Sequence, residues 1–217
     1  MSEIAAAHPV SAAHAAPRDD ERYSFEGATH GKVGMWIFLL TDGMSFFGLL
    51  LGYAILRSGS HSWPDPNKHL GIGFTAVMTF VLICSSVTMV MAVAAAQQKN
   101  KKALTRWLGL TILGGLFFLS GQVVEYRHLI SEGMTLSGML FSGGDIHFPS
   151  TFFIITGFHG MHVLTGVIYL TSVEIMALRG KYTDGPNPPS SHVEVLGLFW
   201  HFVDLVWILV FTFVYLF

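Results

Sequence analysis

The sequence is poor in charge. Only 12% of its 217 residues are Asp, Glu, Lys or Arg, whereas 52% are hydrophobic and the mean hydropathy is +0.54. A soluble domain carries about 25% charged residues, which keep its surface hydrated. The shortage of charge excludes a water-soluble globule, and the apolar content excludes intrinsic disorder. We therefore expect an integral membrane protein.

Other features are also missing. The single cysteine, Cys84, cannot form a disulfide within the chain, which excludes a secreted disulfide scaffold. The formal net charge of −2 leaves no basic excess for nucleic acid. The GxGxxG, GxxxxGK[ST] and GxSxG motifs of nucleotide-binding proteins and hydrolases do not occur. Residues 1–30 lack an apolar core before a small-residue cleavage site, so we expect a loosely held tail and no cleaved signal peptide.

Long apolar stretches are what the sequence does contain. A membrane-spanning helix needs about 20 such residues at a rise of 1.5 Å each. Charged flanks delimit five stretches: 33–56, 70–96, 107–124, 151–178 and 195–217. The sequence therefore predicts one all-α domain over residues 31–217, a bundle of five transmembrane helices. It has no room for an extramembrane domain.

Lys and Arg are unevenly distributed among the connections. The tail and the second and fourth connections hold nine, namely Arg18, Arg22, Lys32, Lys99, Lys101, Lys102, Arg106, Arg179 and Lys181, and the other two hold three, namely Arg57, Lys68 and Arg127. Loops rich in Lys and Arg stay in the cytoplasm. We therefore predict a cytoplasmic N-terminus and an outside C-terminus, as an odd number of spans requires.

The first stretch contains an intramembrane carboxyl group, Asp42. An ionisable group at this depth costs about 3 kcal/mol unless it is paired, protonated or hydrated. Helical spacing places Asp42 near Ser45, Gly48 and Gly52, and a GxxxG pair lets another backbone approach closely. We expect Asp42 to face protein. Two interpretations remain open: a protonated carboxyl bonded to Ser45 or a neighbouring helix, or a proton-handling or gating residue.

Polar groups recur in three other stretches at helical spacing. They are Gln122 and Glu125 at the end of the third, His159 and His162 in the fourth, and Glu194, His201 and Asp204 at the start of and within the fifth, and we place Trp200 in the same network. Such stripes predict hydrogen bonds between packed helices or to lipid head groups. Trp36, Trp63, Trp107 and Trp200 lie at or near span ends, where indole rings favour the membrane interface.

A metal centre is the alternative interpretation of these groups. Glu125-x-x-His128 resembles half of a di-iron site at a membrane boundary. A di-iron bundle needs two Glu-x-x-His pairs and two further Glu residues, and the chain has one such pair. No spacing marks an axial haem ligand. We therefore expect no metal or haem centre within this chain.

Three segments, in order, resemble subunit III of the haem–copper respiratory oxidases. The first, His30–Phe47, is similar to the family's first core helix with its intramembrane carboxylate at Asp42. The second contains Thr156-Gly-Phe-His-Gly-Met-His-Val, which is similar to the family's most recognisable signature. The third, Val193–Trp207, resembles the closing helix and matches it at Glu194, Trp200, His201, Asp204 and Trp207. The resemblance covers about residues 30–217 and points to the short, five-helix bacterial type.

This resemblance implies an auxiliary subunit in the bacterial cytoplasmic membrane. It would dock against subunit I, which holds the haems and copper, reduces dioxygen to water and pumps protons, with subunit II in the same complex. It would stabilise subunit I, hold phospholipid between its helices and support proton entry. Two departures are visible: the first two of seven spans are missing, and Asp42 stands where many members carry Glu.

Other functions remain open at this point. We expect an oxidase of the cytochrome c type. A quinol-oxidase subunit and a nitric-oxide-reductase accessory protein share this fold and are the alternatives, because the sequence does not identify the electron donor. A small multi-pass transporter is the alternative from another class. Transporters usually show paired halves, whereas five spans do not divide evenly and no internal repeat is visible.

Overall fold

The computed structural model describes residues 30–61, 63–64, 70–136, 138–139, 147–182 and 191–217. The predicted tail, residues 1–30, lies outside the described residues except for its last position. Five long helices account for most of the described chain: α1 (His30–Gly59), α3 (Ile72–Gln97), α4 (Lys101–Ser131), α5 (His147–Leu178) and α6 (Ser191–Val210). Each is long and apolar enough to cross a membrane, counting α6 together with the turn that follows it, so the predicted five-helix membrane fold is confirmed.

Several helices extend beyond their apolar stretches. Helix α4 begins at Lys101, six residues before the predicted span, because Asn100 caps it: its side-chain oxygen accepts a hydrogen bond from the Ala103 amide at 3.2 Å. It also continues to Ser131, past the predicted end at residue 124. Hydropathy marks the part of a helix that lies in lipid, whereas capping groups mark where the helix itself begins.

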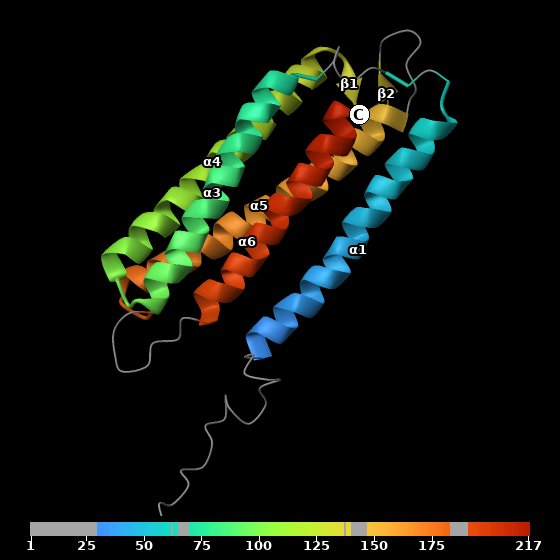
Figure 1. Ribbon diagram of the computed structural model, residues 1–217. Helices are drawn as coiled ribbons and strands as arrows, with labels where there is room; N and C mark the ends of the chain where they lie inside the picture. The colour runs from blue at the N-terminus through green and yellow to red at the C-terminus, as the bar shows by residue number, and fades with distance from the viewer. Residues whose placement is uncertain (1–29, 62, 65–69, 137, 140–146, 183–190) are drawn as a thin grey trace, which may run out of the picture.

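A two-stranded β-ribbon and a π-helical turn are the short elements of the described residues. Strand β1 (Met134–Thr135) pairs antiparallel with β2 (Gly138–Met139) in the connection between α4 and α5. The last turn, Phe211–Leu216, is a π-helix that continues α6. Both elements lie at the end of the bundle where α1 and α4 finish (Figure 1).

The helices run alternately up and down. Helices α3, α4, α5 and α6 pack into a four-helix bundle, and α1 lies along its edge against α6 and α5 (Figure 1). Helix α1 is the least covered: 17% of its most apolar window is buried, against 50% for the last helix. One side of α1 is therefore open to lipid or to another protein.

The centre of the bundle forms around Trp200 of α6. Its side chain is fully buried, and the indole nitrogen donates to the Ser85 hydroxyl of α3 at 3.1 Å. A methyl group added to Gly115 or Gly166 would come within 2.7 or 2.8 Å of the Trp200 ring, so the two glycines make room for it. Trp200 is thus a core residue, which corrects its interpretation as an interfacial anchor.

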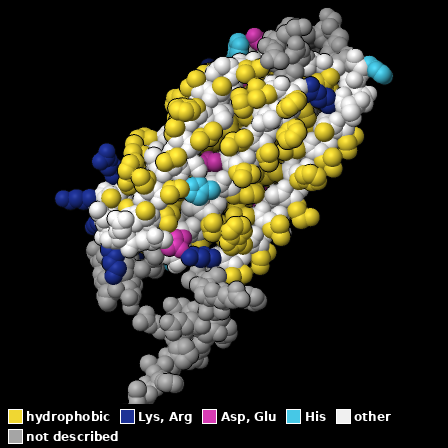
Figure 2. Space-filling model, in the orientation of Figure 1, with side chains coloured by type: hydrophobic (Ala, Val, Ile, Leu, Met, Phe, Trp, Pro, Cys, Tyr) yellow, Lys and Arg dark blue, Asp and Glu magenta, His cyan; other side chains and the backbone are white. Residues whose placement is uncertain are grey.

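The outer surface is apolar. Figure 2 shows hydrophobic side chains along the whole length of the helices on the face in view, with most of the visible Lys and Arg gathered where α3 meets α4. Large exposed side chains occur on every long helix, including Phe47, Phe80, Leu113, Ile168 and Leu205. In water this surface would drive aggregation, whereas in a bilayer it is satisfied by lipid chains or by neighbouring subunits.

Candidate functional site

A buried polar pair joins α1 to α5. The Asp42 Oδ1 and His162 Nε2 atoms lie 3.1 Å apart, and the two side chains are 9% and 15% exposed. The rings of Phe46 and Phe158 lie against the imidazole, with centroids 5.2 and 4.6 Å away. Asp42 therefore faces a neighbouring helix, near the middle of α1.

The hydrogen bonds of His162 determine how many protons the pair carries. Its Nδ1 lies 2.8 Å from the Phe158 carbonyl oxygen, which can only accept, so Nδ1 carries a proton. A neutral His162 then has an unprotonated Nε2, and Asp42 must donate to it; a charged His162 donates to an ionised Asp42. In both arrangements one proton lies between Asp42 and His162.

The surroundings of Asp42 differ in part from the prediction. Ser45 donates to the Thr41 carbonyl oxygen at 3.3 Å, not to Asp42, and the second carboxyl oxygen of Asp42 is buried with no hydrogen-bond partner. A methyl group added to Gly48 or Gly52 would meet nothing within 4 Å. The GxxxG pair therefore contacts no other helix within the described part of this chain.

His159 is buried more deeply than His162 and has different neighbours. Its ring is fully buried, with centroids 4.8 Å from Trp207 and 5.6 Å from Phe118, and neither ring nitrogen has a hydrogen-bond partner. The two histidines were predicted on one helix face, yet three residues correspond to about 300° of rotation, which separates them by about 60°. His159 consequently packs on α4 and α6, whereas His162 contacts α1.

Gln122 joins α4 to α5. Its side-chain amide donates to the Thr156 carbonyl oxygen at 2.7 Å and to the Tyr126 hydroxyl at 3.2 Å. Tyr126 also shares a hydrogen bond of 2.7 Å with the Thr156 hydroxyl. A methyl group on Gly160 would lie 2.6 Å from the Gln122 side-chain oxygen. The glycine between the two histidines of the signature thus provides space for the amide.

Glu125 is buried between α3, α4 and the last turn of the chain, and its predicted place at a membrane boundary stays a prediction. Thr75 of α3 donates to one carboxylate oxygen at 2.9 Å, and Tyr215 of the last turn donates to the other at 3.0 Å. His128 does not join Glu125; its Nε2 lies 3.4 Å from Glu132 on the surface. Among the residues that the structure describes, no group of three or more His, Cys, Asp or Glu is placed to hold a metal ion.

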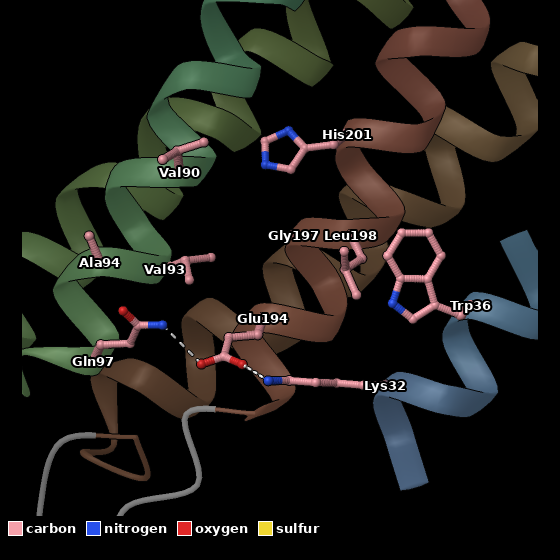
Figure 3. Close-up of a pocket in the computed structure, with 10 residues that line it drawn as sticks. All are labelled: Lys32, Trp36, Val90, Val93, Ala94, Gln97, Glu194, Gly197, Leu198 and His201. Atoms are coloured by element: carbon pink, nitrogen blue, oxygen red, sulfur yellow. Dashed lines mark hydrogen bonds and ion pairs between the residues drawn. The ribbon is translucent and has the colours of Figure 1, made fainter. Parts of the chain in front are cut away.

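A groove opens between α1, α3 and α6 at the end where α1 and α6 begin. Figure 3 shows Glu194 between Lys32, with which it forms an ion pair, and Gln97, whose amide donates to it at 3.1 Å. The groove has a volume of about 480 Å³, and Trp36 and His201 also line it. It offers one positive and one negative side chain beside an apolar wall.

Deeper in the same region, α6 contributes two more ionisable residues. His201 Nδ1 lies 2.6 Å from the Ser86 hydroxyl of α3. Asp204 is 4% exposed, and neither of its carboxyl oxygens has a hydrogen-bond partner, although Ser86 is close to it. The Trp207 indole nitrogen, one turn further, donates to Thr79 of α3 at 2.8 Å.

Comparison with known proteins gives one consistent answer. A family model for cytochrome c oxidase subunit III matches residues 26–217. The chain is 38% identical to cytochrome c oxidase subunit 3 of Corynebacterium diphtheriae over 187 residues, which cover 85% of this chain and 86% of the relative. It is 37% identical to the same subunit of Synechocystis over 186 residues, or 84% of this chain and 74% of the relative. The chain belongs to the cytochrome c oxidase subunit III family.

Membership of the subunit III family confirms the resemblance inferred from sequence. The protein is a multi-pass membrane protein and an auxiliary subunit of an oxidase complex that contains further subunits. The family name gives cytochrome c, not quinol, as the donor class of the relatives.

The sequence predicted the ionisable residues but missed their partners. In α3, Thr75, Thr79, Ser86 and Gln97 each bind a side chain on another helix, and none was predicted as a site residue. These positions follow the three- and four-residue spacing of one helix face. A stripe of polar side chains on a span without charges, such as α3, therefore marks the face on which the helices with ionisable residues pack.

Proposed function

We propose that this subunit III performs no redox chemistry of its own and serves the catalytic subunit of a proton-pumping cytochrome c oxidase. It lies in the bacterial cytoplasmic membrane with its N-terminus in the cytoplasm. It contacts subunit I directly, with subunit II in the same complex, and the haems and copper reside in those partners. It stabilises subunit I, holds phospholipid and supports proton uptake.

The buried Asp42–His162 pair is the observation that carries this proposal. A redox site or a transport path needs ligating or solvent-facing groups, whereas this pair connects two helices and is covered by Phe46 and Phe158. The other ionisable side chains that bond across helices, Glu125, Glu194 and His201, do so in the same way. Such contacts position helices, and they leave the apolar exterior to lipid and to partner subunits.

Assembly is tested by purifying the chain through an affinity tag from its own membrane. We expect a haem-bearing subunit to co-purify in a one-to-one ratio, and the separated chain to show no Soret band. A chain that purifies alone with stoichiometric haem or copper, or that reduces dioxygen by itself, contradicts the proposal.

A proton-handling role for Asp42 is the second part of the proposal. Its free carboxyl oxygen and the shared proton support it, because a proton can move between Asp42 and His162 without creating net charge in the membrane. The substitution Asp42→Asn removes the mobile proton but keeps a side-chain donor for His162. In the whole oxidase this substitution should leave the initial rate of oxygen reduction nearly unchanged. It should abolish labelling by a carbodiimide at position 42, because the reagent reacts with a carboxyl group. It should also shorten the time for which the oxidase stays active during turnover.

Glu125→Gln provides the matched control for this experiment. Both oxygens of Glu125 already accept hydrogen bonds, so we expect the control to leave carbodiimide labelling of the subunit in place. If Asp42→Asn blocked assembly of the oxidase while Glu125→Gln did not, Asp42 would be structural. If Asp42→Asn changed neither labelling nor endurance, the proton-handling role would be wrong.

The groove in Figure 3 supports the lipid-binding part. Lys32 and Glu194 offer partners for the phosphate and the ammonium of a zwitterionic head group, and Val90, Val93 and Leu198 line an apolar path for its chain. Lys32→Gln in the whole oxidase should lower the phosphatidylethanolamine retained after detergent purification. Lys101→Gln, on the same end but outside the groove, should not. Equal retention in the two variants would contradict a head-group site here.

A further inference from the structure

A second groove lies at the opposite end of the molecule, between α1 and the end of the chain. It has two connected parts. The part nearer the end of α1 has a volume of about 430 Å³ and is lined by Tyr53, Arg57 and Phe217, together with Leu50, Ala54, Ser58 and Phe213. The deeper part has a volume of about 440 Å³ and is lined almost entirely by apolar side chains of α1 and α6. Leu50, Ala54 and Phe213 line both parts and connect them.

The outer part holds hydrogen-bond donors without acceptors. Tyr53 is 2% exposed, and its hydroxyl has no hydrogen-bond partner among the residues that the structure describes. One guanidinium nitrogen of Arg57 is buried and also has none, and Arg57 forms no ion pair with a described residue. The two side chains are four residues apart, so they project from the same face of α1. A buried donor without an acceptor is costly, which indicates that a ligand supplies one.

The chemistry of this pair indicates an oxyanion. A guanidinium group binds phosphate through two parallel hydrogen bonds, and a tyrosine hydroxyl can donate a third. Among the residues that the structure describes, no Asp or Glu lines either part of the groove, so the ammonium of a zwitterionic head group would find no partner in this lining. Arg57 also lies at the end of the bundle that carries few cations in the sequence, where a positive charge needs a local reason.

The shape of the groove indicates that the oxyanion belongs to a lipid. The lining of α1 runs from Arg57 down to Gly43, which is about 21 Å at 1.5 Å per residue. Half of a bilayer, head groups included, is about 20–22 Å thick. The groove therefore has the depth of one leaflet, with donors at its polar end and apolar walls formed by Phe47, Leu205 and Leu209 along the rest.

We propose that this groove binds one anionic glycerophospholipid of the outer leaflet, with its phosphate on Arg57 and Tyr53 and an acyl chain between α1 and α6. The inference rests on the proposed function, in which the subunit holds phospholipid within the oxidase. It assigns a different site and a different head-group class from the groove at Lys32 and Glu194. The lipid would fill the gap between α1 and α6 and so fix the outer half of α1.

The test uses the whole oxidase, depleted of lipid with detergent and then titrated with dioleoylphosphatidylglycerol or dioleoylphosphatidylethanolamine. Bound lipid is counted by native mass spectrometry. We expect the wild type to bind one phosphatidylglycerol with clear preference over phosphatidylethanolamine. Arg57→Gln should weaken that binding about tenfold, because it removes a charge-assisted hydrogen-bond pair. Tyr53→Phe should weaken it less, and Arg57→Lys should keep the preference for the anionic lipid.

Arg127→Gln is the matched control, since Arg127 is exposed at the same end of the bundle and lines neither part of the groove. It should bind phosphatidylglycerol like the wild type. Equal binding by Arg57→Gln, or equal binding of the two lipids by the wild type, would overturn the proposal. Competition by millimolar inorganic phosphate alone would identify a soluble anion as the ligand and overturn it too. The titration of wild-type oxidase decides the head-group preference even where Arg57→Gln does not assemble.

Failure here is distinguishable from failure of the proposed function. Lys32→Gln tests the inner groove and should leave the phosphatidylglycerol count unchanged. If Arg57→Gln had no effect while Lys32→Gln lowered phosphatidylethanolamine retention, this inference would be wrong and the lipid-holding function would stand.

Discussion

The same substitution, glycine to alanine, should have opposite effects at two positions of this bundle. At Gly166 of α5 the added methyl group would lie 2.8 and 2.9 Å from two atoms of the Trp200 ring and 3.2 Å from Phe199. The ring cannot move aside, because its other edge lies against Gly115 and its nitrogen is bonded to Ser85. Overpacking of this kind costs about 1–3 kcal/mol. We therefore expect Gly166→Ala to lower the free energy of unfolding by that amount.

At Gly48 of α1 the added methyl group meets nothing within 4 Å. Alanine is favoured over glycine within a helix by about 1 kcal/mol. The gain in the free energy of unfolding is smaller if α1 stays helical in the unfolded state, because the same preference then stabilises both states. Gly48→Ala should therefore leave the isolated subunit unchanged or slightly more stable. In the oxidase it should weaken assembly if another helix packs closely on the Gly48–Gly52 face.

The measurement is equilibrium unfolding of the purified subunit in mixed micelles, as the dodecyl sulfate fraction is raised. Tryptophan fluorescence and helical circular dichroism follow the transition, and circular dichroism is the common probe for the variant that lacks Trp200. The double variant Gly166→Ala/Trp200→Phe isolates the cause, because the smaller ring removes the contact and should recover part of the loss. A Gly166→Ala protein as stable as the wild type, or a double variant no better than the sum of the single ones, would refute the packing argument.

Three further predictions concern the polar contacts. Asp42→Asn should change the free energy of unfolding by less than about 0.5 kcal/mol, because the amide can donate to His162. Asp42→Ala removes the hydrogen bond and should cost about 0.6–1.7 kcal/mol. Equal losses for the two variants in the same unfolding assay would contradict the shared-proton pair. Tyr215→Phe leaves one buried oxygen of Glu125 without a donor and should lower the free energy of unfolding by about 1–2 kcal/mol. Tyr169→Phe, measured in the same assay, is the control. Lys32→Gln should cost no more than about 1 kcal/mol, since Lys32 is 34% exposed and the ion pair with Glu194 is partly solvated; a larger loss would show that the pair holds α1 in place.

The membrane fold was predictable because hydropathy reports directly on the solvent. Five stretches of the required length can only be helices that satisfy their own backbone hydrogen bonds in lipid. The residues at which the helices begin and end were harder to predict from the sequence. The cap at Asn100 and the continuation of α4 to Ser131 depend on local hydrogen bonding among polar residues, which a hydropathy boundary does not detect. For the same reason hydropathy did not reveal the bonds of Glu125 to Thr75 and Tyr215.

The sequence predicted which residues belong to the candidate site but not which residues contact one another. An ionisable group inside a span identifies Asp42, His159 and Asp204 without a structure, because each needs a reason to be there. Which partner each meets depends on rotation about the helix axis. A shift of about 60° separates His162, which binds Asp42, from His159, which contacts only aromatic rings. Trp200 shows the same limit: its position near a span end suggested the interface, while glycines on two other helices placed it in the core.

Helix α1 combines the least burial with two of the cross-helix polar contacts. Within lipid, apolar area alone gives helices little reason to associate, since lipid chains are as apolar as leucine. The bond of Asp42 to His162 therefore determines where the first half of α1 lies, and the partly solvated ion pair of Lys32 with Glu194 adds a weaker contact. Beyond Asp42 the described chain provides no such contact, and the unpartnered Tyr53 and Arg57 lie in that second half. A lipid bound there would provide the missing polar contact. The position of the second half of α1 would then depend on membrane composition, and that of the first half on the proton between Asp42 and His162.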